Sequence, residues 1–90
     1  MTFSQEMKAI GQSLLNLAAF IELSDDSTID PDSAVSALEQ LLVELNAGDA
    51  ADREYLRGLM RQEIGSMPDD RSSAQQARVE FYLDLMENLN

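Results

Sequence analysis

The chain has 90 residues with 17 acidic and six basic side chains, a net charge of −11, and neither Cys nor His. Disulfides, thiolate chemistry and imidazole bases or metal ligands are therefore excluded. We expect residues 1–90 to form one domain with a thin core, because a chain this short buries only about 60–65% of the surface that its unfolded form exposes. We also expect a cytoplasmic protein, since no run reaches the roughly 20 apolar residues of a membrane span and the N-terminus lacks a signal peptide's cationic start.

An amphipathic helix is predicted over residues 4–23. Apolar side chains recur there at three- and four-residue spacing, which places them on one face of a helix. The members of this face are Phe3, Met7, Ile10, Leu14, Leu17, Ala18 and Ile21. Thr2 and Gln5 together predict a capping box at the helix start.

Three further apolar residues of this helix point away from that face. Successive residues of a helix are about 100° apart, so Leu15, Phe20 and Leu23 lie off the stripe. A helix that is apolar on nearly every side is either central in its bundle or buried against a second chain, and a monomer of this length has little room for a central helix. We therefore expect these three residues to mediate self-association, most simply as a twofold homodimer.

Asp30 and Pro31 mark the start of a second helix over residues 31–46. The Asp carboxylate can accept N–H groups of the first turn, and Pro at the first position loses no hydrogen bond. The apolar stripe of this helix is Val35, Leu38, Leu41, Leu42 and Leu45. The loop before it is rich in Asp, but an EF-hand loop counted from Asp26 would need glycine where Pro31 stands. We therefore expect a helix-capping loop and no metal site.

A third helix is predicted over residues 50–64, closed by Gly65 and stopped by Pro68. Its apolar residues are Leu56, Met60 and Ile64, with Tyr55 and Leu59 beside them. Arg53, Arg57 and Arg61 form a cationic ridge at four-residue spacing, and neither Glu54 nor Glu63 is well placed to neutralise it. We expect the ridge to pair with the acidic half of the same molecule or of a twin subunit, or to be solvated.

A fourth helix is predicted over residues 72–88. Ser72 or Ser73, each followed three residues later by Gln, caps its start. Its stripe is Ala74, Ala77, Phe81, Leu85 and Leu89, widened by Tyr82 and Met86. No segment alternates apolar and polar residues as a half-buried strand does. The sequence thus predicts an all-α fold, a small bundle of about four helices built from two helical hairpins.

The side chains offer no catalytic constellation. General acid–base catalysis at neutral pH needs a group that titrates near 7, and no acidic residue lies inside an apolar stripe where burial would raise its pKa. Serine has no base partner, and no glycine-rich phosphate loop or metal-binding helix motif is present. We therefore expect a non-catalytic protein that uses no cofactor and acts by binding a macromolecule.

The negative charge is concentrated in the first half of the chain. Residues 1–52 carry one Lys against ten acidic residues, a net charge of −9, whereas residues 53–90 carry five Arg against seven acidic residues, a net charge of −2. Such a field repels nucleic acid and anionic membranes and attracts basic protein surfaces. Solubility alone is an alternative reason for it. The candidate partner-binding residues are Glu22, Asp26, Asp30, Asp32, Glu39 and Glu44.

One stretch of the sequence is similar to a known family. Leu38-Glu39-Gln40-Leu41-Leu42-Val43, then Ala50-Ala51-Asp52 and the aromatic Tyr55, follow an aspartate-rich loop with a single proline. This order resembles the small acidic helical immunity proteins that neutralise type VI secreted toxins. The resemblance implies a cytoplasmic dimer of helical hairpins whose acidic surface blocks a cognate toxin.

Two other functions fit the same residues. An acidic helical protein can imitate nucleic acid, with carboxylates in place of phosphates, and so inhibit a DNA-binding or defence enzyme of the kind that phages target. It can also serve as an oligomeric scaffold or adaptor with no inhibitory role.

Overall fold

The computed structural model describes the backbone of residues 2–90 and the side chains from Met7 onward. It contains α1 (Thr2–Leu23), α2 (Pro31–Ala47), α3 (Ala50–Ser66) and α4 (Ser73–Asn88), with no strand among these residues. The all-α class and the four-helix organisation predicted from the sequence are confirmed.

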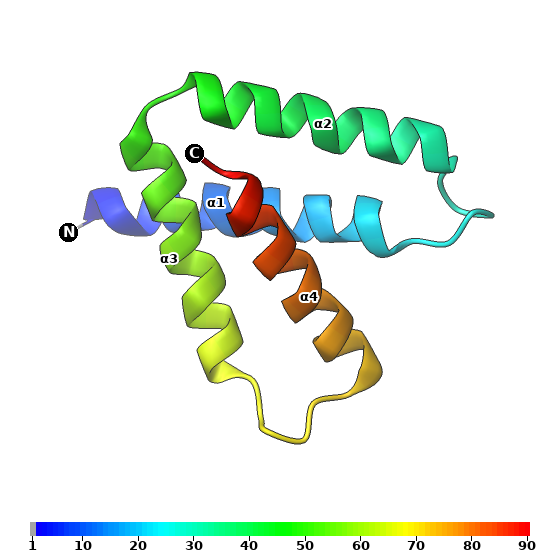
Figure 1. Cartoon of the computed structure of the whole chain (residues 1–90). Helices are drawn as coiled ribbons and strands as arrows, with labels where there is room; N and C mark the ends of the chain where they lie inside the picture. Colours follow the sequence, from blue (N-terminus) through cyan, green and yellow to red (C-terminus); the bar gives the residue numbers. More distant parts are fainter. Residues whose placement is uncertain (1) are drawn as a thin grey trace.

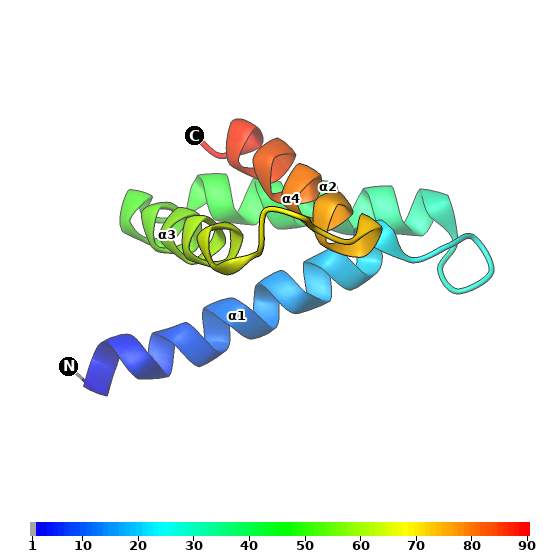
Figure 2. The same ribbon diagram turned by 90° about the horizontal axis from the view of Figure 1, so that it is seen from below.

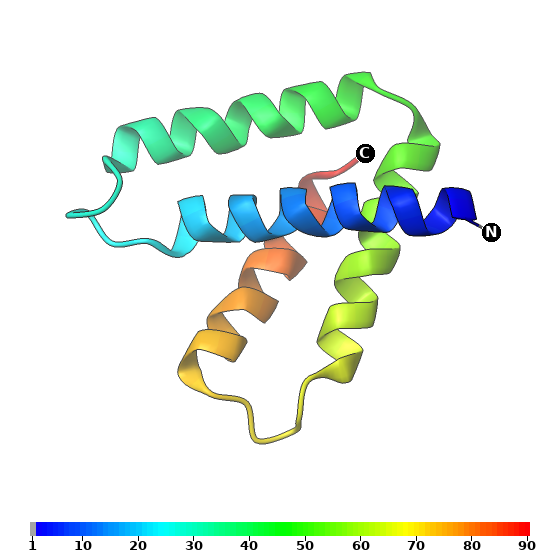
Figure 3. The ribbon, with the colours of Figure 1, turned by 180° about the vertical axis from the view of Figure 1, so that it is seen from behind.

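Two antiparallel hairpins make up the bundle (Figure 1). The helices α1 and α2 run alongside each other, and the α3–α4 hairpin crosses α1 steeply, as the view from behind shows (Figure 3). Seen from below, α1 lies on one side of the layer that contains α3 and α4 (Figure 2). Both α1 and α3 contact each of the other three helices.

Two of the predicted caps set the starts of α2 and α4. Asp30 Oδ2 accepts a hydrogen bond of 3.0 Å from the N–H of Ser33, with Pro31 in the first helical position. Ser72 and Gln75 form the reciprocal capping box at the start of α4. The capping box predicted for Thr2 and Gln5 lies outside the described side chains.

The expected end of the third helix is wrong by two residues. Gly65 does not close α3, because it does not take the left-handed backbone conformation that ends many helices. The helix instead continues to Ser66, with Met67 as its cap. Pro68 then supplies no N–H that could continue the helix.

The core is built from α1, α3 and α4. Its fully buried apolar residues are Leu15, Ala18, Ala19, Leu56, Leu59, Met60, Val79, Phe81, Tyr82, Leu85 and Leu89. No residue of α2 is fully buried, and four of its leucines only pack against the edge of the core. The second hairpin therefore supplies most of the buried surface, and α2 covers one flank of α1.

The burial of α1 differs from the predicted stripe. Leu15, expected at a subunit interface, is only 1% exposed and lies in the core of the single chain, whereas Ile10 and Leu17 are 72% and 58% exposed. The reason is steric, since α1 meets the second hairpin through small buried side chains at Ala18 and Ala19 as well as Leu15. Small residues let helix axes approach closely, so the buried face of α1 follows these small residues together with Leu15.

Gly11 marks the closest approach of α1 to α3. A Cβ atom placed there would lie 2.6 Å from Leu59 Cδ1 and 3.2 Å from Tyr55 Cε2. Gly58, in the middle of α3, has open space where its Cβ would be. The two glycines therefore separate the effect of helix propensity from the effect of packing.

We expect Gly58→Ala to raise the free energy of unfolding by about 0.5–1 kcal/mol, because Ala restricts the unfolded chain and favours helix. Gly11→Ala gains the same propensity but overpacks a contact that typically costs about 1–3 kcal/mol. Urea denaturation should show that the free energy of unfolding of Gly11→Ala is about 2 kcal/mol lower than that of Gly58→Ala. Equal stabilities would contradict the close packing of α1 on α3.

Candidate functional site

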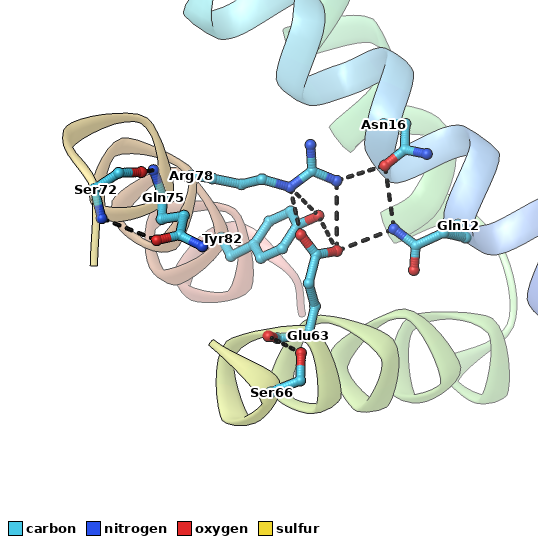
Figure 4. Close-up of polar contacts among 8 residues, drawn as sticks. All are labelled: Gln12, Asn16, Glu63, Ser66, Ser72, Gln75, Arg78 and Tyr82. Carbon is cyan, nitrogen blue, oxygen red and sulfur yellow. Dashed lines mark hydrogen bonds and ion pairs between the residues drawn. The ribbon is translucent and has the colours of Figure 1, made fainter. Parts of the chain in front are cut away.

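The main polar cluster joins three helices around the carboxylate of Glu63 (Figure 4). Glu63 Oε1 accepts hydrogen bonds from Gln12 Nε2 at 3.0 Å and from the Tyr82 hydroxyl at 2.7 Å. Arg78 forms an ion pair with Glu63 Oε2 and also donates to Asn16 Oδ1. The guanidinium lies over the Tyr82 ring, with its central carbon 5.2 Å from the ring centroid. The cluster thus links α1, α3 and α4.

The electrostatics of this cluster favour a structural role. Partial burial raises the pKa of Glu63, but the hydrogen bonds from Tyr82, Gln12 and Arg78 outweigh that effect and hold its pKa below the usual value. Burial and the neighbouring carboxylate raise the pKa of Tyr82 to about 12. At neutral pH the carboxylate is therefore ionised and the phenol is neutral. Neither group is poised for proton transfer near pH 7.

Sequence reasoning missed this cluster, although one signal was available. Arg78 and Tyr82 are four residues apart and so share a face of α4, which placed a cation beside a phenol. Their partner Glu63 comes from the other arm of the hairpin, and the pairing depends on the register between α3 and α4. Helical periodicity alone does not fix that register.

The stability of the protein should depend on the Glu63 carboxylate. We expect Glu63→Gln to lower the free energy of unfolding by about 2 kcal/mol at pH 7, because hydrogen bonds to a charged group are lost. The folded-state pKa lies below the reference value of 4.5, so the contribution is present above pH 4.5 and disappears as the pH falls through the folded-state value. Denaturation curves from pH 7 to 3 should show the two proteins converging.

Glu54→Gln is the matched control for this prediction. Glu54 forms an ion pair of 3.0 Å with Arg57, but its side chain is 60% exposed. Exposed pairs contribute only about 0–1 kcal/mol. If Glu54→Gln lowered the free energy of unfolding as much as Glu63→Gln does, the special role of the partly buried cluster would be contradicted.

Two arginines of the predicted cationic ridge bind main-chain carbonyls. Arg53 Nη1 donates to the carbonyls of Leu45 and Gly48 at 2.8 Å each, and thereby satisfies the end of α2. Arg57 Nη2 donates to the carbonyls of Leu89 and Asn90 beyond the end of α4. The ridge therefore joins helix ends within the molecule.

Part of the prediction for this ridge needs correction. Glu54 was judged badly placed, yet it pairs with Arg57 because residues three apart on a helix are neighbours. Asn46 also links the end of α2 to the end of the described chain: its side chain donates to the carbonyl of Asn88 and accepts from the N–H of Asn90. Arg61 is the exposed member of the ridge.

We expect Arg53→Ala to destabilise the fold by about 2 kcal/mol, because it removes the hydrogen bonds that a charged donor makes to the carbonyls at the end of α2. Arg53→Lys should recover little of that loss, since an ammonium cannot reproduce the planar fork of donors. Arg61→Ala serves as the control on the same helix and should change stability by less than about 0.5 kcal/mol. Thermal unfolding of the three variants measures these differences. Full stability in Arg53→Lys would contradict a role for the planar fork of donors.

The six acidic residues proposed for partner binding are all exposed but do not share one face. Asp32 and Glu39 are seven residues apart and so lie along one edge of α2, whereas Glu44 lines a hollow between α1 and α2. Glu22 and Asp26 flank a small hollow beside the α1–α2 loop. The structure thus brings Glu22 and Asp26 together and separates Glu44 from Glu39.

The aspartate-rich loop is ordered by its own hydrogen bonds. Asp25 Oδ1 accepts from the hydroxyls of Ser27 and Thr28 at 2.7 and 3.0 Å, and these bonds lower the pKa of Asp25. Asp30 serves as the cap of α2. Among residues whose side chains are described, no group of three or more acidic side chains is arranged to hold a metal ion.

Two of the three residues predicted to mediate self-association lie at the surface. Phe20 and Leu23 are 55% and 44% exposed, and they line a shallow hollow with Ala74 and Arg78 between α1 and α4. The third, Leu15, is in the core, as described above. None of the helices is both long and apolar enough to cross a bilayer, judged over the part of the chain that the structure describes.

Comparison with protein-family models, with curated proteins and with solved structures finds no match to this chain.

Proposed function

We propose that this protein is a non-catalytic inhibitor that binds a basic partner protein, in the manner of a cytoplasmic immunity protein that neutralises a type VI secreted toxin. The observation that carries the proposal is the pairing of unneutralised carboxylates with exposed apolar side chains on the α1–α2 hairpin. Acidic groups would accelerate encounter with a basic surface, and apolar contacts would slow dissociation.

The distribution of ion pairs supports this proposal. Among the described side chains, the two ion pairs engage Glu54 and Glu63 of α3, both outside the acidic first half. The exposed carboxylates of α2 are therefore free of intramolecular cations. Their field remains available to a partner.

Exposed apolar side chains are the second feature that supports the proposal. Ile10 and Leu17 of α1, with Val35 and Val43 of α2, are among the exposed large apolar residues. In the same proposal, Phe20 and Leu23 mediate homodimer formation away from the hollow lined by Glu44. The partner and the twin subunit then use different sides of α1.

The test uses the protein encoded by the neighbouring gene. Expressed alone in a bacterial host, that protein should arrest growth, and co-expression of the present chain should restore growth and yield a complex. A harmless neighbour, or arrest that continues in the presence of this chain, would contradict the immunity proposal.

The affinity of that complex should then be measured at low and high salt, with and without heparin. Reversing Glu22, Glu39 and Glu44 to Lys should lower the association rate and flatten its salt dependence. A toxin-specific inhibitor should resist competition by heparin. Strong displacement by heparin together with a steep loss of affinity in salt would instead identify a nucleic-acid mimic.

A further inference from the structure

Two neighbouring apolar hollows follow α1, and together they are called the groove below. One hollow of about 340 Å³ lies between α1 and α2, and a second of about 260 Å³ lies where α1 meets the end of α2 and the first turns of α3. Leu14 lines both hollows, so they adjoin at its side chain. The large apolar residues of α1 that line it are Met7, Ile10, Leu14, Leu17 and Ile21, and the small residues Gly11 and Ala18 line it as well.

The lining of α1 has the spacing of a helix-packing seam. These five residues are separated by three, four, three and four positions, the repeat that receives side chains of another helix. The seam covers 14 residue steps, which corresponds to about 21 Å at 1.5 Å per residue. Leu15, Ala18 and Ala19 carry the fully buried contacts of α1, whereas Ile10 and Leu17 of this seam are mainly exposed and Leu14 is only half-buried.

The opposite wall of the groove is also incompletely buried. Leu38 and Leu41 of α2 and Leu45 at its end line the groove, and each is only half-buried. No residue of α2 reaches full burial. A third helix laid along the seam would complete the burial of both walls.

The charged residues that line the groove are acidic. Glu44 lines the first hollow and Asp52 the second, and neither carboxylate takes part in an ion pair. The single basic residue of the first 52, Lys8, lines a different hollow, with Gln12 and Glu63. The rim of the groove is therefore acidic and its floor is apolar.

We propose that this groove binds a basic amphipathic helix of about four turns from the partner protein, with apolar residues on the seam and Lys or Arg beside Glu44 and Asp52. This inference rests on the proposed function, since it names the element of the partner that is recognised. The acidic rim argues against a second copy as the occupant, because two copies would bring the same carboxylates together. Recognition of this kind places an amphipathic helix in an apolar groove.

A synthetic peptide tests the groove without knowledge of the partner. The probe is a fluorescent Leu–Lys peptide of about 14 residues, with Leu at three- and four-residue spacing. The controls are a Leu–Glu peptide of the same pattern and a Leu–Lys peptide whose order is shuffled to destroy the amphipathic face. Fluorescence anisotropy with the full chain should show binding of the first peptide alone.

Surface variants locate the binding. Leu17→Ser should lower the affinity for the peptide about tenfold or more, whereas Leu83→Ser, a change at a similarly exposed position on α4, should leave it unaltered. Glu44→Gln should weaken it about threefold at low salt, and Glu39→Gln, on the other edge of α2, should have a smaller effect. All four positions are exposed, so the fold should persist, and circular dichroism checks that it does.

Three results would overturn the inference. The first is that the Leu–Lys peptide does not bind. The second is that Leu17→Ser and Leu83→Ser lower its affinity equally. The third is that sedimentation shows a dimer, which Leu17→Ser converts to monomer and Phe20→Ser does not. The last result would assign the groove to a second copy.

The growth-rescue assay separates failure of the groove from failure of the function. If the wild-type chain and Leu17→Ser protect cells equally, the inhibitor function stands and the groove is not the docking site. If the wild-type chain does not protect, the proposed function falls, and the peptide measurements still decide whether the groove binds a basic helix.

Discussion

The close contact of α1 with the second hairpin determines the arrangement of the molecule. Gly11 lets α3 approach until the side chain of Leu59 fills the space where a Cβ would stand. Ala18 and Ala19 continue the same narrow face toward the end of α1. Leu15 is the large side chain of α1 that joins this contact, whereas Ile10 and Leu17 remain mainly exposed.

Polar ties then fix how the helices are arranged around that contact. The Glu63 cluster joins α1 to both arms of the second hairpin, and Arg53 and Arg57 join the ends of α2 and α4 to α3. These groups are partly buried, so each must be satisfied inside the protein. They select one register among the several that an apolar core of leucine and alanine would accept.

Local signals predicted the elements well and the assembly less well. Caps at Asp30 and Ser72 and the three- and four-residue spacing located four helices, because these features act within one turn of the chain. The buried face of α1 was predicted only in part: Ala18 of the predicted stripe is buried, but Leu15 and Ala19 lie off it, and Ile10 and Leu17 are exposed, since area favours large side chains whereas close packing favours small ones. Periodicity does not report which of these effects prevails.

The candidate binding surface, too, was predicted in its composition but not in its arrangement. Acidity and excess apolar surface were visible in the sequence, but Leu15 proved to be core, and Glu39 and Glu44 proved to lie on different edges of α2. The groove could not be predicted, because it exists only where the seam of α1 meets the half-buried leucines of α2. Its position depends on tertiary packing.

The absence of any fully buried residue in α2 also has a consequence for dynamics. Segments with few buried contacts open at a lower free energy than the whole protein unfolds. Amide protons of α2 can therefore exchange with solvent through local opening while α1, α3 and α4 stay packed. A ligand that covers α2 would raise the free energy of this opening. Binding would therefore slow amide hydrogen exchange along the whole helix.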